Sequence, residues 1–166
     1  MATPFTPTEA QKRDILIHVF YEIEQMLLAS ERKSSEQWLN NALLESTLLH
    51  ARSLVHFFDD TTRKGKDVLS TDFGFSRCGP CISAADKERL DKELAHLTYA
   101  RLDRATNEDR TWDYAVLLTP ILERARDFAV HITNGPWTIG DPRLTGDCWR
   151  LLVGLIDERL ARYAQR

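Results

Sequence analysis

The stretch WLNNALLESTLLHARSLVHFFDD, residues 38–60, decides the fold because its apolar residues recur with the period of an α-helix. The apolar side predicts a face turned to the protein core and comprises Leu43, Leu44, Thr47, Leu48, Ala51, Leu54, Val55 and Phe58. The opposite side carries what we call the charged row, made of Glu45, Arg52, His56 and Asp59. Leu49 falls inside this row, so we expect the row to face another helix, another subunit or a ligand.

The composition of the 166-residue chain is that of one globular domain. Hydrophobic residues make up 43% and charged residues 28%, which excludes the disordered and membrane-protein classes. The net charge of −3 predicts no general attraction to nucleic acid, so RNA would have to bind a local patch. The three cysteines, an odd number without a secretion signal, predict reduced thiols and a cytoplasmic protein.

Helical spacing elsewhere predicts a single all-α domain over residues 1–166, a bundle of four to five mostly antiparallel helices. The expected helices cover residues 7–29, 36–60, 84–102, 112–133 and 147–164. Capping residues predict where the first three begin, namely Thr6-Pro7 with Glu9, then Ser34 or Ser35, then Ser83.

Two features of this pattern indicate surfaces with a possible role in function. The first helix has a second apolar stripe, Ile17, Tyr21 and Leu28, which predicts either a central position in the bundle or contact with a partner subunit. The connection over residues 61–82 is long, polar and contains glycine. Because such connections are uncommon in compact domains and tend to be functional or mobile, we expect a lid there.

Arginine and histidine in the charged row could bind a phosphate and move a proton. Arg52 and His56 are four residues apart and therefore adjacent on the helix surface, with Glu45 and Asp59 two turns from Arg52 on either side. A guanidinium forms a fixed fork for phosphate and an imidazole titrates near physiological pH, which suits cleavage of RNA through its 2′-hydroxyl. The alternative is a surface ladder of ion pairs, each worth well under about 1 kcal/mol.

The segment ALLESTLLHARSLVHFFDD, residues 42–60, together with HLTYAR, residues 96–101, resembles a recurrent pattern of small bacterial helical proteins of uncharacterised function. More distantly it is similar to the HEPN superfamily of helical bundles. The resemblance covers the second to fourth helices. It implies a metal-independent ribonuclease of a toxin or defence system that works as a dimer, with an arginine and a histidine separated by four to six residues.

Only three residues separate Arg52 from His56, which departs from the HEPN spacing. Better-spaced pairs occur elsewhere, and Arg126 with His131 in RDFAVH is preferred because a polar residue follows the arginine, as in the family. The alternative for Arg126 and His131 is a solvated face near a helix end. The remaining matches are Arg13 with His18, Arg89 with His96 and Arg124 with His131.

Arg101 continues the apolar stripe of the third helix and is either an inward-pointing ion partner or a residue beyond the helix end.

Cys78-Gly79-Pro80-Cys81 has the tetrapeptide sequence of thioredoxins, but no strand precedes it here. Beside a helix N-terminus this pair could form a redox switch. With Cys148 and a histidine it could instead hold zinc, and the third interpretation is an inert loop. We favour the inert loop and predict neither a metal nor a cofactor.

The leading prediction is a non-catalytic cytoplasmic interaction module that associates with itself or with a partner protein. It rests on the two-sided first helix and on the leucine inside the charged row. The alternative is a HEPN-like ribonuclease or toxin that uses an arginine and histidine pair, and a second alternative is redox or zinc chemistry at the CGPC loop.

Overall fold

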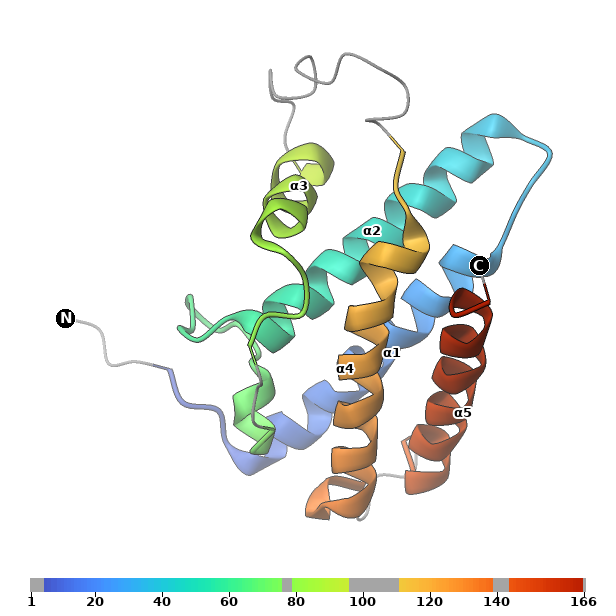
Figure 1. The fold of residues 1–166 in the computed structure, drawn as a ribbon. Helices are drawn as coiled ribbons and strands as arrows, with labels where there is room; N and C mark the ends of the chain where they lie inside the picture. Colours follow the sequence, from blue (N-terminus) through green and yellow to red (C-terminus); the bar gives the residue numbers. More distant parts are fainter. Residues whose placement is uncertain (1–4, 76–78, 96–110, 139–143, 166) are drawn as a thin grey trace.

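The computed structural model describes residues 5–75, 79–95, 111–138 and 144–165. Within these ranges the fold is all-α, as predicted, and contains no strand. The helices are α1 (Glu9–Glu31), α2 (Gln37–Asp59), α3 (Ala84–Ala95), α4 (Tyr114–Asn134) and α5 (Gly146–Tyr163), with short 3-10 turns η1 (Ser70–Phe73) and η4 (Pro136–Thr138). Figure 1 shows α1 beside α2 and α4 beside α5, with α3 across α2. None of the described helices is long and apolar enough to cross a membrane.

Two of the three predicted capping residues are wrong, although the helices begin within two residues of the expected positions. α1 begins at Glu9, and its N-cap is Thr8 rather than the predicted Thr6. The Thr8 side chain accepts the Gln11 backbone N–H at 3.2 Å, and the Gln11 side chain accepts the Thr8 N–H at 2.9 Å. These two bonds form a capping box. α2 has Glu36 at its N-cap without a side-chain cap bond.

The Ser34 hydroxyl accepts the Glu36 N–H at 3.0 Å and so shapes the turn before α2 rather than capping it. Ser83 does cap α3, since its hydroxyl accepts the Asp86 N–H at 3.1 Å. The predicted end of this helix at residue 102 lies outside the described residues.

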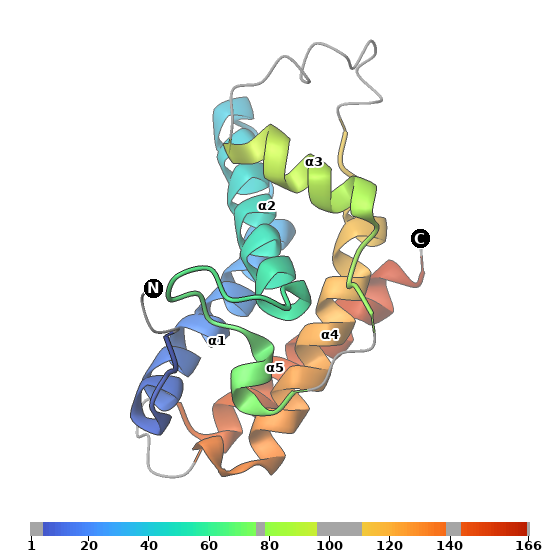
Figure 2. The same cartoon turned by 90° about the vertical axis from the view of Figure 1, so that its left-hand side faces the viewer.

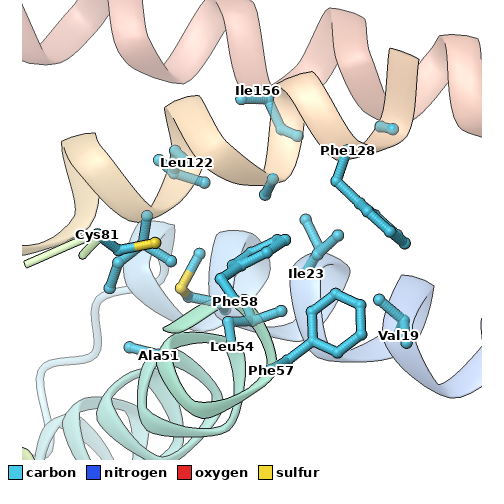
Figure 3. Close-up of a cluster of buried hydrophobic side chains, with 14 of the residues drawn as sticks. Val19, Ile23, Ala51, Leu54, Phe57, Phe58, Cys81, Leu122, Phe128 and Ile156 are labelled. Carbon is cyan, nitrogen blue, oxygen red and sulfur yellow. The ribbon is translucent and has the colours of Figure 1, made fainter. Parts of the chain in front are cut away.

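Aromatic rings from α2, η1 and α5 meet at Phe128 on α4, and the α5 ring is that of Trp149 at 6.1 Å. Its ring centroid lies 5.1 Å from that of Phe57, 5.9 Å from Phe58 and 5.6 Å from Phe73. Figure 3 shows Phe57 and Phe58 of α2 extending toward Phe128, with Val19 and Ile23 of α1 beside them. The predicted apolar face of residues 38–60 is therefore confirmed as the core side, except that Leu43 and Leu44 are only half-buried.

The connection between α2 and α3 is held to the core rather than standing open as a lid. Leu69, Phe73, Cys81 and Ile82 from this segment are all buried.

The second apolar stripe of α1 is on the outside, because Tyr21 and Leu28 are exposed. α1 is therefore not enclosed by its neighbours on every side, and the central position that its wide apolar surface suggested is not observed.

We predict that Phe128→Ala lowers the free energy of unfolding by about 3–5 kcal/mol, because it removes the ring on which the aromatic cluster converges. Phe5→Ala is the matched control, since Phe5 is half-buried near the N-terminus and should cost less than about 1 kcal/mol. Urea denaturation followed by circular dichroism measures both. Equal losses for the two variants would contradict this description of the core.

Candidate functional site

Arg52 and His56, one turn apart on α2, both reach one oxygen of a carboxylate on α3. The Arg52 Nε donates to Asp91 Oδ1 at 2.7 Å, and His56 Nε2 lies 2.9 Å from the same atom. Two hydrogen-bonding nitrogens that converge on one oxygen are the arrangement that recognises an oxyanion. The neighbouring helix supplies that oxyanion here.

The second ring nitrogen of His56 faces another carboxylate. His56 Nδ1 lies 3.0 Å from Asp60 Oδ2, and Lys87 Nζ donates to Asp60 Oδ1 at 2.9 Å. Basic side chains and carboxylates thus alternate in what we call the charge network, formed by Arg52, Asp91, His56, Asp60 and Lys87. A doubly protonated imidazole would donate to both carboxylates, which orients the ring. The side chains are only partly buried, each about one-fifth to one-third exposed.

The two carboxylates of the network are stabilised in the ionised form. Burial by itself would raise the pKa of Asp91, but hydrogen bonds from His56 and Arg52 outweigh it, so this pKa lies below its ordinary value of 3.8. Burial acts in the same direction on Asp60, and hydrogen bonds from Lys87 and His56 again bring the pKa below 3.8. The network is therefore fully charged on its acidic side at neutral pH.

We predict that Asp91→Asn lowers the free energy of unfolding by about 0.5–1 kcal/mol at neutral pH, a value limited by solvent screening of these part-exposed ion pairs. Because the pKa of Asp91 is lower in the folded than in the unfolded state, its contribution is present above pH 3.8 and is lost as the pH falls through the folded value. The difference between wild type and variant should accordingly shrink in acid.

Urea denaturation between neutral pH and about pH 3 measures this difference. Glu45→Gln is the control, since Glu45 is exposed and makes no hydrogen bond or ion pair with another described residue. A pH-independent cost for Asp91→Asn, or an equal cost for Glu45→Gln, would contradict the assignment.

The charge network borders a groove of about 500 Å³ between α1, α2 and the connection that follows α2. Figure 2 shows this connection passing the C-terminal end of α2 toward α1, with α3 across α2. Apolar residues including Ile15, Val19 and Phe57 line the groove, and its charged lining comprises His18, Glu22, Arg52, His56, Asp60, Lys64 and Asp67. The charged row therefore opens in part into a groove rather than entirely into bulk solvent.

A second hollow of about 310 Å³ continues the groove along α1, because the two share Ile15, His18 and Val68. Further cationic groups border it, and two of them, the Arg63 guanidinium and the Lys66 ammonium, each lie 5.7 Å from the centroid of the Phe5 ring. Basic groups and an aromatic ring thus follow one another along this side of the molecule.

Of the four predicted members of the charged row, only Arg52 and His56 share a carboxylate. Glu45 lies two turns away on the exposed surface of α2. Asp59 turns toward the following segment, where its two oxygens accept the Cys81 backbone N–H at 2.9 and 3.0 Å. Asp59 therefore shapes the chain before α3 and does not join the site.

The structure does not bring the preferred HEPN-spaced pair together. Arg126 Nε binds Asp157 Oδ1 on α5 at 2.5 Å, whereas His131 Nε2 lies 2.8 Å from the carbonyl oxygen of Phe73. Residues five apart on a helix point about 140° away from each other, which explains the divergence. Arg101 and His96 lie outside the described residues.

Sequence reasoning missed the acidic half of the site, Asp60 and Asp91, together with Lys87. A usable signal was present on α3. Lys87 and Asp91 are one turn apart and flank Leu90, which is buried and marks the face turned toward the bundle. When two helices pack through their buried stripes, the polar residues beside one stripe meet the polar residues beside the other. On α2 those polar residues belong to the charged row.

The described half of the CGPC motif is unsuited to thiolate chemistry. Burial raises the pKa of the Cys81 thiol to about 12, and the nearby Asp59 carboxylate acts in the same direction. The described residues include no group of three or more His, Cys, Asp or Glu side chains arranged to hold a metal ion. Cys78 lies outside the described residues, so the pair as such is not described.

We predict that native Cys81 reacts with iodoacetamide at pH 8 about a thousandfold more slowly than Cys81 in the unfolded chain, because its pKa lies at about 12 instead of 9.0. Peptide mass spectrometry after timed alkylation, with and without urea, measures the two rates for the same residue. Comparable rates would show that the thiol is accessible and ionised, and would restore the redox interpretation.

Comparison of the chain with protein-family models, with curated protein sequences and with solved structures finds no match. The geometry of the side chains is therefore what supports a functional proposal, and the likeness to HEPN proteins stays a prediction.

Proposed function

We propose that this protein is a helical binding module for RNA, with Arg52 and His56 as the pair that holds a phosphate at the groove between α1 and α2. The observation that carries the proposal is the convergence of Arg52 Nε and His56 Nε2 on Asp91 Oδ1, at 2.7 and 2.9 Å. A phosphate oxygen accepts the same two hydrogen bonds as this carboxylate oxygen. RNA would take the place of Asp91 in this arrangement.

The groove and its continuation offer further cations along their length, interspersed with carboxylates. Beyond Arg52 and His56 the groove presents His18 and Lys64 together with the carboxylates of Glu22, Asp60 and Asp67. Its continuation presents Arg63, which is paired with Asp72, and Lys66 near the Phe5 ring. Cations spaced along a groove track successive phosphates, and an aromatic ring offers a surface on which a base can stack. Because the chain has a net charge of −3, RNA binding would depend on these local cations and above all on Arg52 and His56. We also propose that the protein is cytoplasmic, because its odd number of cysteines predicts reduced thiols.

A second candidate is RNA cleavage, which the contact between Asp60 and His56 favours. The carboxylate of Asp60 holds His56 Nδ1 at 3.0 Å, so the opposite nitrogen, Nε2, points to the position proposed for the phosphate. In this candidate the ring proton is on Nδ1 and Arg52 holds the phosphate, so that Nε2 is free to accept the proton of a 2′-hydroxyl as that oxygen attacks phosphorus. The O2′–P bond forms and the P–O5′ bond breaks, and the 5′-oxygen takes a proton from water. The resemblance to HEPN ribonucleases supports this candidate.

We predict that the protein binds a fluorescently labelled single-stranded RNA in low salt, and that Arg52→Ala and His56→Ala each weaken binding about tenfold or more, because each loses a phosphate contact. Asp91→Asn should strengthen binding, since it removes the competing carboxylate charge. Fluorescence anisotropy in EDTA measures all of these dissociation constants.

Arg126→Ala and His131→Ala serve as matched controls, because they change the same residue types on α4, where the two side chains diverge. They should leave binding unchanged. Absence of binding by the wild type, or equal losses in the α4 variants, would refute the RNA proposal. Products ending in a 2′,3′-cyclic phosphate, lost in His56→Ala, would establish the cleavage candidate, and intact RNA would eliminate it.

A further inference from the structure

Figure 1 shows α5 at the edge of the bundle, and two of its leucines are exposed. Leu151 is 71% and Leu155 is 52% exposed. They are one helical turn apart, so their side chains form a continuous apolar surface on one helix face. Neither belongs to the groove beside α2, whose lining includes no residue of α5.

Between these leucines lies a glycine that nothing in the described chain requires. A Cβ atom added to Gly154 would meet no atom within 4 Å. Glycine inside a helix costs about 1 kcal/mol relative to alanine. A missing side chain at this position leaves room for another helix to approach closely.

Four charged residues flank the leucines in the order Asp147, Arg150, Glu158 and Arg162, so their signs alternate along α5. Within one copy Arg150 pairs with Asp147 at 3.3 Å and Arg162 pairs with Glu158 at 3.6 Å and with Glu31 at 3.0 Å. These part-exposed pairs can extend to a second copy at small cost. All four side chains are more than half exposed, at 86%, 60%, 67% and 58%. Two copies of this face laid antiparallel bring every acidic residue opposite a basic one, whereas a parallel arrangement pairs like with like. The pattern is therefore complementary to itself in a two-fold symmetric contact.

We infer that the outer face of α5 is the contact surface of a homodimer in which the α5 helices of two copies pack antiparallel. In this arrangement Leu155 of one copy sits over Gly154 of the other. Asp147 then lies opposite Arg162 and Arg150 opposite Glu158. A contact limited largely to one helix pair is small, so we expect a dissociation constant on the order of 10 μM. This inference does not depend on RNA binding in the groove.

Sedimentation equilibrium from about 1 to 500 μM tests the inference. We expect a monomer–dimer equilibrium in the wild type, and a dissociation constant raised about tenfold or more by Leu155→Glu or Leu151→Glu. Leu49→Glu is the matched control, since Leu49 on α2 is 53% exposed, close to the 52% of Leu155. It should leave the equilibrium unchanged. Circular dichroism confirms that each variant is folded.

A charge exchange tests the antiparallel arrangement separately. Arg150→Glu and Glu158→Arg should each weaken the dimer, because each places like charges opposite one another across the two-fold axis. The double variant Arg150→Glu/Glu158→Arg should recover at least half of the lost association free energy. A wild type that stays monomeric up to about 500 μM, or an effect of Leu49→Glu equal to that of Leu155→Glu, would overturn the α5 surface. Failure of the double variant to recover would overturn the antiparallel packing.

Discussion

The packing of Phe57 and Phe58 against Phe128 is the constraint on which the rest of the structure depends. These rings hold α2 against α4 and thereby fix the rotation of α2 about its own axis. Once that rotation is fixed, the opposite side of α2 has to face α3 and the groove. The position of Arg52 and His56 is thus a consequence of aromatic packing on the other side of the same helix, and not of the ion pairs that these two residues make.

The charge network itself contributes little stability for its size. Ion pairs between partly exposed side chains are worth at most about 1 kcal/mol each, whereas burial of a single aromatic ring is worth several times more. A network of this kind is therefore easily rearranged at small cost. Loss of the Asp91 contacts is expected to leave the fold intact, because buried Leu90 continues to hold α3. The proposed exchange of Asp91 for a phosphate depends on this difference in magnitude.

Helical periodicity was sufficient to predict the all-α fold, the core side of α2 and the proximity of Arg52 to His56, because these depend only on angles within one helix. It could not predict Asp91, which is 35 residues further along the chain and reaches His56 only through tertiary packing. Asp59 was assigned to the charged row by its angular position on the helix. The backbone that follows α2 brings the Cys81 N–H within hydrogen-bonding distance, and Asp59 accepts that bond instead. Arg126 and His131 satisfied a spacing rule, yet a separation of five residues points them apart.

An NMR titration of the histidine rings with a single-stranded RNA oligonucleotide tests most directly whether the groove beside α2 is the ligand site. The chain has five histidines, so the ring signals can be assigned by single substitutions. We predict that the signals of His56 and His18, both of which line the groove, shift on addition of RNA, while that of His131 stays in place. A shift confined to His131, or no shift at His56 at saturating RNA, would contradict this description of the site.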